Sequence, residues 1–231
     1  MDRINRLIEK FDIKLDSAKY VIEEEDKIVA KYKFDCFFSN IFHGRILQYG
    51  IFKGNDTIIL IKPGQDGSLI GYKNKYYNLA TYLNSKYGYT IVCCNNPYDR
   101  KYNSLEDAVN VIEEYVKEMN FEEYKIYFLG TSNGGVLGAK HCYLYPNIKR
   151  FLMLNPPLFI FFNNMKEGLK KFDGEKIVFL YGDLDPSYMF TWLLDLVGND
   201  KISYNILEDE DHNLSNNHYT LEELVEKYLI N

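Results

Sequence analysis

The chain has 231 residues, of which 46% are hydrophobic, so it can bury the core of one sizeable domain and is not a disordered chain. Its formal net charge is −6, and no basic stripe interrupts the mixed acids and bases, which argues against nucleic acid as the main partner. No stretch approaches about eighteen uninterrupted apolar residues, and the opening MDRINRLIEKFDIKLD lacks an apolar signal region. We therefore expect neither a transmembrane segment nor a secretion signal.

The cysteines indicate the compartment. Cys36, Cys93, Cys94 and Cys142 show no CxxC spacing. Cys93 and Cys94 are adjacent in an apolar run, so their side chains would point to opposite faces of a strand. We expect reduced, buried thiols, and from these a cytoplasmic protein.

The first part of the chain, residues 1–53, has the least regular pattern. We expect a short helix and then three partly alternating strands, at residues 2–10, 20–24, 28–34 and 45–52. These strands predict an antiparallel edge that precedes the main sheet. His43 lies between Phe42 and Gly44, and we interpret it as a structural or surface residue.

From residue 57 onward the pattern alternates between strand, loop and helix. Buried strands are expected at residues 57–61, 90–94, 126–129, 151–154 and 177–181, with a last, alternating strand at 202–207. Helices are expected at residues 75–87, 104–119, 135–145, 188–197 and 220–230. Gly88 ends the first helix, and Thr220 and Glu223 have the spacing of a capping box at the start of the last one.

This alternation predicts an α/β fold with a mostly parallel sheet that helices cover on both faces. No repeat, low-complexity tract or linker divides the chain, so we expect a single domain over residues 1–231. Ligands of such sheets bind at the carboxyl ends of the strands.

The segment of residues 125–140, KIYFLGTSNGGVLGAK, organises the rest of the chain. An apolar run ends in Gly130–Gly134, which fits the pattern G-x-S-x-G, and a helix is expected after it. So tight a turn forces Ser132 into a strained backbone conformation, while Gly130 and Gly134 let strand and helix approach closely. The serine oxygen would be exposed at the carboxyl edge of the sheet, beside the free N–H groups of the helix start.

A serine hydroxyl is a poor nucleophile, so it needs a base and an acid that orients the base. Asp185 and His212 directly follow the last two predicted strands, and both would therefore lie at the same sheet edge as Ser132. His218 is an alternative base, whereas His141 lies within the helix that follows Ser132. The sequence therefore predicts a site built from Ser132, Asp185 and His212.

These residues resemble the α/β-hydrolase superfamily. The glycine-serine turn looks like its nucleophile elbow, and the order Ser132, Asp185, His212 is the order in which the superfamily uses nucleophile, acid and base. The pattern G-x-x-D after a strand is similar to its acid position, which selects Asp185 over Asp183. The resemblance covers about residues 45–230.

The resemblance also implies an oxyanion hole made of two backbone N–H groups. One belongs to Asn133, the residue after the nucleophile. The other comes from the loop Pro63-Gly64-Gln65, where many relatives have His-Gly, and falls to Gln65. The proline departs from the pattern of the family, although Pro63 itself is not the expected donor.

Relatives commonly insert a lid between the strands that end near Asn155 and begin at Ile177. The interval, residues 156–176, leaves room for a small lid only. It is rich in aromatic residues, which could form core or the wall of an acyl pocket together with a later apolar group: Leu158 to Phe162, Met189, Phe190 and Trp192.

Two other classes of function stay open. A non-catalytic binding module of the same fold would show a broken triad. A magnesium-dependent phosphotransfer site would use Asp183 and Asp185, although such a pair normally opens its domain rather than closing it. The acidic run Glu208–Asp211 is typical of a solvated loop. HExxH, the P-loop lysine motif and the GxGxxG fingerprint are absent.

The sequence thus favours a serine hydrolase that cleaves short-to-medium acyl esters, a small-molecule substrate, without metal or cofactor. A thioesterase, amidase or acyltransferase would use the same residues. Catalysis needs the neutral imidazole of His212, so activity should decline below roughly neutral pH as that ring gains a proton. The oligomeric state stays open.

Overall fold

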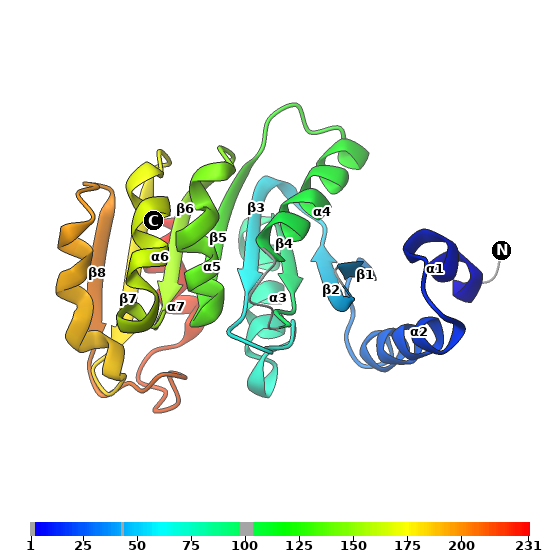
Figure 1. Ribbon diagram of the computed structural model, residues 1–231, viewed down its shortest axis with the longest axis horizontal. Coiled ribbons are helices and arrows are strands. Elements are labelled where there is room, and N and C mark those ends of the chain that lie inside the picture. Colours follow the sequence, from blue (N-terminus) through cyan, green and yellow to red (C-terminus); the bar gives the residue numbers. More distant parts are fainter. Residues whose placement is uncertain (1–2, 43, 98–103) are drawn as a thin grey trace.

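The computed structural model describes residues 3–42, 44–97 and 104–231, and its strands form one sheet (Figure 1). The eight strands lie in the order β1-β2-β4-β3-β5-β6-β7-β8. β1 pairs antiparallel with β2, and β2 pairs antiparallel with β4, whereas all later pairs are parallel. The strands are β1 Cys36–Phe42, β2 Arg45–Phe52, β3 Asn55–Lys62, β4 Tyr89–Cys94, β5 Lys125–Thr131, β6 Ile148–Leu154, β7 Lys176–Gly182 and β8 Ile202–Leu207. The predicted mostly parallel sheet with an antiparallel N-terminal edge is confirmed.

Helices cover both faces of this sheet, as predicted, and an apolar layer of the core lies between the sheet and the helices on each face (Figure 1). One face carries α4 Ser104–Met119, α5 Asn133–His141, α6 Leu158–Lys171 and the 3₁₀ helix η3 Pro186–Leu196. The other face carries α3 Lys75–Tyr87, α7 Leu221–Val225 and the π-helical turn η4 Glu226–Ile230. Cys94 and Cys93 belong to the first and the second core respectively, so adjacent side chains do point to opposite faces.

The N-terminal region differs from the prediction. Residues 20–24 and the beginning of 28–34 belong to α2 Leu15–Val29, so the two strands expected there are wrong. Buried Ala18, Val21 and Glu25 recur at helical spacing over the whole of α2, and this longer period outweighs the short alternating windows. The strand expected at 45–52 is confirmed as β2, and its antiparallel partner β1 was not expected.

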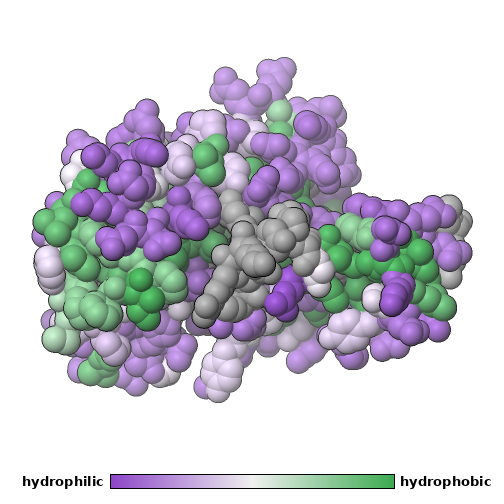
Figure 2. All heavy atoms as spheres, in the orientation of Figure 1, coloured by the Kyte–Doolittle hydropathy of each residue, from purple (hydrophilic) through white to green (hydrophobic). Residues whose placement is uncertain are grey.

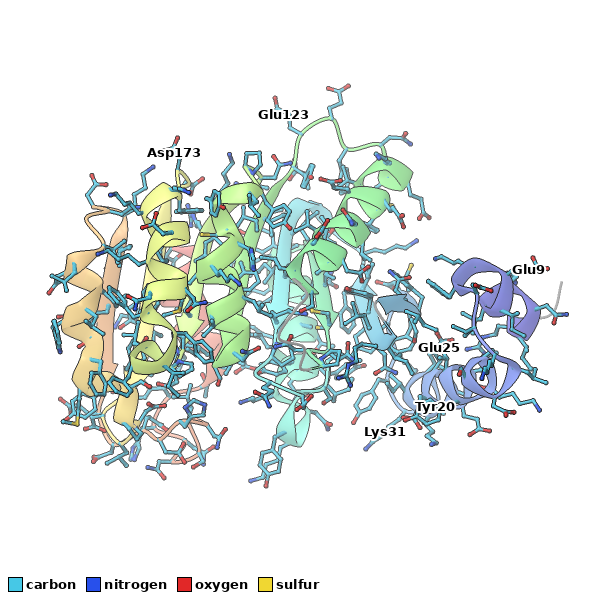
Figure 3. All side chains as sticks on the ribbon, viewed as in Figure 1. Glu9, Tyr20, Glu25, Lys31, Glu123 and Asp173 are labelled. Carbon is cyan, nitrogen blue, oxygen red and sulfur yellow. The ribbon has the colours of Figure 1, made fainter. Side chains whose placement is uncertain are left out.

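The first helix, α1 Arg3–Phe11, agrees with the short helix that the sequence predicts. It packs on α2 at the end of the molecule beyond β1, and Arg3 joins the two helices by ion pairs to Glu25 and Asp26 (Figures 1 and 3). His43 lies outside the described residues. No helix in the described part of the chain is both long and apolar enough to cross a membrane.

Helix ends follow the expected local chemistry. Gly88 adopts φ +67° at the end of α3, and the capping box of Thr220 and Glu223 is present at the start of α7. The helix after Ser132 ends at His141 and continues only as a short 3₁₀ turn. Within residues 156–176, α6 packs against α5.

Candidate active site

Ser132 lies at the turn between β5 and α5 in a rarely populated backbone conformation. Its φ is +50° and its ψ is −120°. Such a conformation costs about 1–3 kcal/mol and persists only where the surroundings fix it. One fixing contact is the hydrogen bond that Ser132 N donates to Leu154 O over 2.7 Å, across to the end of β6. The half-buried hydroxyl itself makes no hydrogen bond to any described residue.

The two glycines of the motif permit close backbone contacts. A Cβ added to Gly130 would lie 2.8 Å from the backbone N of Gly135, where strand and helix meet. A Cβ added to Gly134 would lie 2.4 Å from the carbonyl oxygens of Lys62 and Pro63, at the end of β3. Both distances are shorter than real contacts, so a side chain at either position would push the serine turn away from its neighbours.

The loop after β3 lies against the serine. A Cβ added to Gly64 would be 3.2 Å from Ser132 Cβ, so the loop lies closely against Ser132. Gln65 follows directly and is exposed. Among the described residues, the backbone amides of Gln65 and Asn133 donate no hydrogen bond, which leaves both able to bind an oxyanion.

A buried asparagine that the sequence analysis did not single out joins this loop to the serine turn. Asn96 is 1% exposed and follows β4. Its Nδ2 donates to Pro63 O over 3.0 Å and to Asn133 Oδ1 over 3.3 Å. Its backbone adds a two-bond ladder, with Asp66 N donating to Asn96 O and Asn96 N donating to Gly67 O. The loop and the serine turn are therefore fixed relative to each other.

Asp185 and His212 are in contact. Asp185 follows β7 and is 2% exposed, and its Oδ2 accepts a hydrogen bond from Nδ1 of His212. Its Oδ1 accepts from Ser187 N over 2.6 Å. Burial by itself would raise the pKa of the Asp185 carboxyl, but the hydrogen bonds from His212 and Ser187 outweigh burial and hold that pKa below its ordinary value. Because Nδ1 is engaged, Nε2 is the nitrogen of His212 that can accept a proton.

A second buried asparagine, Asn155, holds the histidine loop. It follows β6, is fully buried and adopts φ +48°. Its Nδ2 donates to the carbonyl oxygens of Asp211 and His212, over 3.2 and 3.0 Å, while its Oδ1 accepts from Gly182 N over 2.9 Å. A Cβ on Gly182 would lie 2.1 Å from Glu210 O, so the glycine lets the loop cross the end of β7 closely. These contacts place His212 beside Asp185.

The alternative residues take other positions. His218 is exposed, and its backbone N donates to Glu210 Oε1. His141 lies in α5, where burial lowers its pKa to about 4. No hydrogen bond joins Asp183 to His212, and Asp183 Oδ1 is buried without a hydrogen-bond partner among the described residues. In the described ranges, no group of three or more His, Cys, Asp or Glu lies close enough to hold a metal ion.

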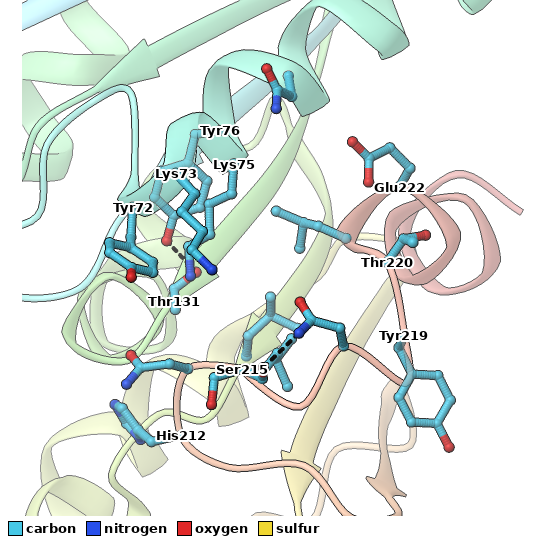
Figure 4. A pocket seen from close by; sticks show the side chains of 16 residues that line it. Tyr72, Lys73, Lys75, Tyr76, Thr131, His212, Ser215, Tyr219, Thr220 and Glu222 are labelled. Atoms are coloured by element: carbon cyan, nitrogen blue, oxygen red, sulfur yellow. Dashed lines mark hydrogen bonds between the residues drawn. The ribbon is translucent and has the colours of Figure 1, made fainter.

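A cavity of about 530 Å³ opens beside His212 (Figure 4). Thr131 and Leu154, at the ends of β5 and β6, are among its lining residues, so it borders the residue on the N-terminal side of Ser132. The turn that begins α3 forms one wall, and residues 212–222 form the other. The size is that of a small-ligand site.

The aromatic group considered for an acyl pocket does not line this cavity. Leu158 is buried in the core, whereas Phe159 is 70% exposed and packs on Phe190 with a ring distance of 4.7 Å. Met189 and Trp192 are also exposed, and apolar side chains gather on this face in Figure 2.

Comparison with known proteins identifies the fold. No family model and no curated protein matches the chain. Among solved structures, it is similar to an alpha-beta serine hydrolase homologue from Coxiella burnetii, with 16% identity and a TM-score of 0.61 over 84% of this chain and 97% of the other. It is similar to Est1E from Butyrivibrio proteoclasticus, with 14% identity and a TM-score of 0.63 over 83% and 95%. A dienelactone hydrolase from Anabaena variabilis shares 14% identity, with a TM-score of 0.57 over 84% and 98%. The chain has the α/β-hydrolase fold.

Proposed function

We propose that this chain is a serine hydrolase that cleaves a small acyl ester through an acyl-enzyme intermediate. The observation that carries the proposal is the contact of His212 with the buried Asp185, at the same sheet edge as the strained Ser132. The likeness to solved esterases and a serine hydrolase homologue supports it. The four free cysteines fit a reducing compartment, and we propose the cytoplasm.

In the proposed reaction, Nε2 of His212 takes the proton of Ser132 as Oγ attacks the ester carbonyl carbon. Asp185 holds the imidazole in the required tautomer and stabilises the imidazolium that forms. The N–H groups of Gln65 and Asn133 bind the oxyanion of the tetrahedral intermediate. His212 then gives its proton to the leaving alcohol, and the serine stays acylated. A water molecule, deprotonated by His212, releases the acid in the same way and restores Ser132.

Thioesterase and acyltransferase chemistry would use the same groups with another leaving group or acceptor. A non-catalytic binding module would keep the fold without a reactive serine. Reactivity of Ser132 separates that module from the enzymes, and the acceptor and leaving group separate the enzymes from one another.

The test is covalent labelling with a fluorophosphonate, followed by mass mapping of the modified residue and a panel of acyl esters and thioesters. We expect label on Ser132, no label in Ser132→Ala, and a loss of turnover of about 10³-fold or more in that variant while it stays folded. Ser85→Ala, an exposed position on α3, is the matched control and should label normally. A chelator should leave turnover unchanged. An unreactive Ser132 together with inactivity across the panel would favour the binding module.

A further inference from the structure

The cavity beside His212 contains basic side chains on one wall. The turn before α3 contributes Tyr72 and Lys73, and Lys75 is the first residue of α3; the loop after β8 lies opposite with His212 and Ser215 (Figure 4). None of these lysines takes part in the proposed acyl transfer. Their position beside the base makes them candidates for contact with the substrate.

Lys75 is half-buried and pairs with no carboxylate in the described part of the chain. Its Nζ lies 5.2 Å from the ring centre of Tyr76, and among the described residues no Asp or Glu forms an ion pair with it. Burial lowers the pKa of Lys75, and the charge of Asp211 opposes this only in part. Withdrawing an ammonium from water without a partner is costly, so an anion that binds beside it gains the missing pairing.

The turn that carries Lys75 is strained and firmly held. Gly71, Lys73 and Asn74 all have positive φ, at +75°, +51° and +64°. The hydroxyl of Tyr32, from the N-terminal region, donates to Asn74 Oδ1 over 2.7 Å. Lys73 and Asn74 are non-glycine residues in a backbone conformation that such residues rarely adopt, and strain of this kind gathers at ligand-binding segments. The turn therefore holds Lys75 at the cavity at an energetic cost.

Two acidic groups limit which anion fits: Glu222 lines the cavity, and Asp211 directly precedes its lining residue His212. Asp211 already accepts hydrogen bonds from Asn213 N, Ser215 N and Ser215 Oγ. Glu222 lies on α7, at the end away from His212 (Figure 4). The charge of Asp211 acts on Lys75 and would repel an anion bound there, so a singly charged ligand is favoured over a doubly charged phosphate.

We infer, on the basis of the proposed function, that Lys75 binds a carboxylate of the substrate. The preferred substrate is then an ester that carries a free carboxylate, such as a half-ester of a dicarboxylic acid. The ester group would lie at Ser132 and His212, and the carboxylate would lie in the cavity between α3 and the loop after β8. Charge-assisted contact with an ammonium gives the selection over neutral esters.

The first experiment measures binding without turnover. In the Ser132→Ala protein, calorimetry compares ethyl hydrogen adipate with the neutral diester ethyl methyl adipate, which has the same chain length. We expect the monoester to bind about tenfold more tightly, a factor that corresponds to roughly 1.4 kcal/mol. Adding Lys75→Met, which keeps an unbranched side chain over Tyr76, should abolish that preference. Lys33→Met removes the same charge from an exposed position and should preserve it.

The second experiment measures turnover of the two esters by proteins with Ser132 intact. Lys75→Met should raise KM for the monoester about tenfold and leave both kcat and the hydrolysis of the diester unchanged. Equal binding of the two esters by the Ser132→Ala protein overturns the inference, whether or not the Lys75 variant folds. If the monoester binds through Lys75 but Ser132 proves unreactive, the cavity assignment stands and the proposed function fails.

Discussion

The two halves of the proposed site, the nucleophile half around Ser132 and the base half around His212, are built alike but held differently. In each, a glycine allows close backbone contact and a buried asparagine bridges two segments: Gly134 with Asn96 on the nucleophile side, Gly182 with Asn155 on the base side. Each asparagine follows a strand and precedes a proline. An asparagine that follows a strand and precedes a proline thus joins the backbone segments in both halves of the site.

The difference lies in what else holds each half. Ser132 sits between a strand and a helix, and its backbone is bonded to β6. His212 begins a loop whose residues 213 and 215–218 are exposed, and the side chain of Asn155 bonds to the carbonyl of His212 itself. We therefore expect the position of the base to depend mainly on two side chains, Asn155 at its backbone and Asp185 at its ring, and the position of the nucleophile on several backbone contacts.

The largest loss of activity is expected from a substitution of Asp185, the proposed acid that orients His212. Asp185→Asn would no longer fix the tautomer of His212 with Nδ1 protonated, so kcat for a simple ester should fall about 10³–10⁴-fold. The fold should survive, because the amide is nearly the same size and can still accept from Ser187 N. Steady-state kinetics and thermal unfolding check both points. Asp183→Asn is the matched control, and an equal loss of kcat in that variant would contradict the assignment of Asp185.

The second prediction tests the base half alone, by a substitution of Asn155. Asn155→Gly deletes the donor to the histidine loop, and glycine accepts the positive φ at this position without strain. Displacing His212 by about 1 Å should lower kcat about 100-fold. Because the surroundings of the base change, the pH profile of kcat/KM should also move, which a merely structural loss would not cause. An unchanged profile would show that Asn155 does not position the base.

The third prediction is the counterpart on the nucleophile side. Asn96→Ala leaves the carbonyl of Pro63 without its donor and frees the loop of Gln65 from Asn133. We expect a loss of kcat of about tenfold, smaller than in Asn155→Gly, because Gly64 still packs on Ser132 and one of the two oxyanion donors keeps its place. The pH profile should stay in place. Stability should fall by about 1–3 kcal/mol, measured by denaturant unfolding, because a buried acceptor loses its partner.

The parts of the structure that the sequence predicted are local ones. Apolar runs between turn residues gave the parallel strands, and the spacing of glycines around Ser132 gave the tight turn. The pattern G-x-x-D selected Asp185, which is the aspartate in contact with His212. Each of these signals is contained in a few neighbouring residues.

The parts that were missed depend on distant partners or on a longer window. Asn155 donates hydrogen bonds to carbonyl groups that lie 56 and 57 positions later in the chain. The only local signal of these bonds is an asparagine followed by proline at the end of a strand. That Lys75 has no carboxylate partner among the described residues likewise becomes visible only once the fold is known. In α2, short stretches of alternating residues led to a prediction of strands, whereas the structure is a helix that buries Ala18 and Val21 on one face.

The smallest expected effect concerns the link between the two walls of the cavity. Glu226, which follows α7, accepts hydrogen bonds from Tyr82 and Tyr87 of α3 and pairs with Lys86. The contact with Lys86, followed by those with the tyrosines, lowers the pKa of Glu226 to about 2. A carboxyl whose pKa is lower in the folded than in the unfolded protein stabilises the fold at pH values above its unfolded pKa, near 4.3, and this contribution is lost as pH falls toward 2.

Glu226→Gln should therefore lower Tm by about 2 °C at pH 7, the modest effect typical of surface ion pairs. The difference from the unmodified protein should persist to about pH 4.5 and shrink below it, as measured by thermal unfolding across that range. Because no hydrogen bond or ion pair joins Glu226 to residues 208–219 in the described part of the chain, kcat at neutral pH should stay unchanged in this variant. A large loss of kcat would mean that η4 also helps to position His212, in addition to the contacts of Asn155.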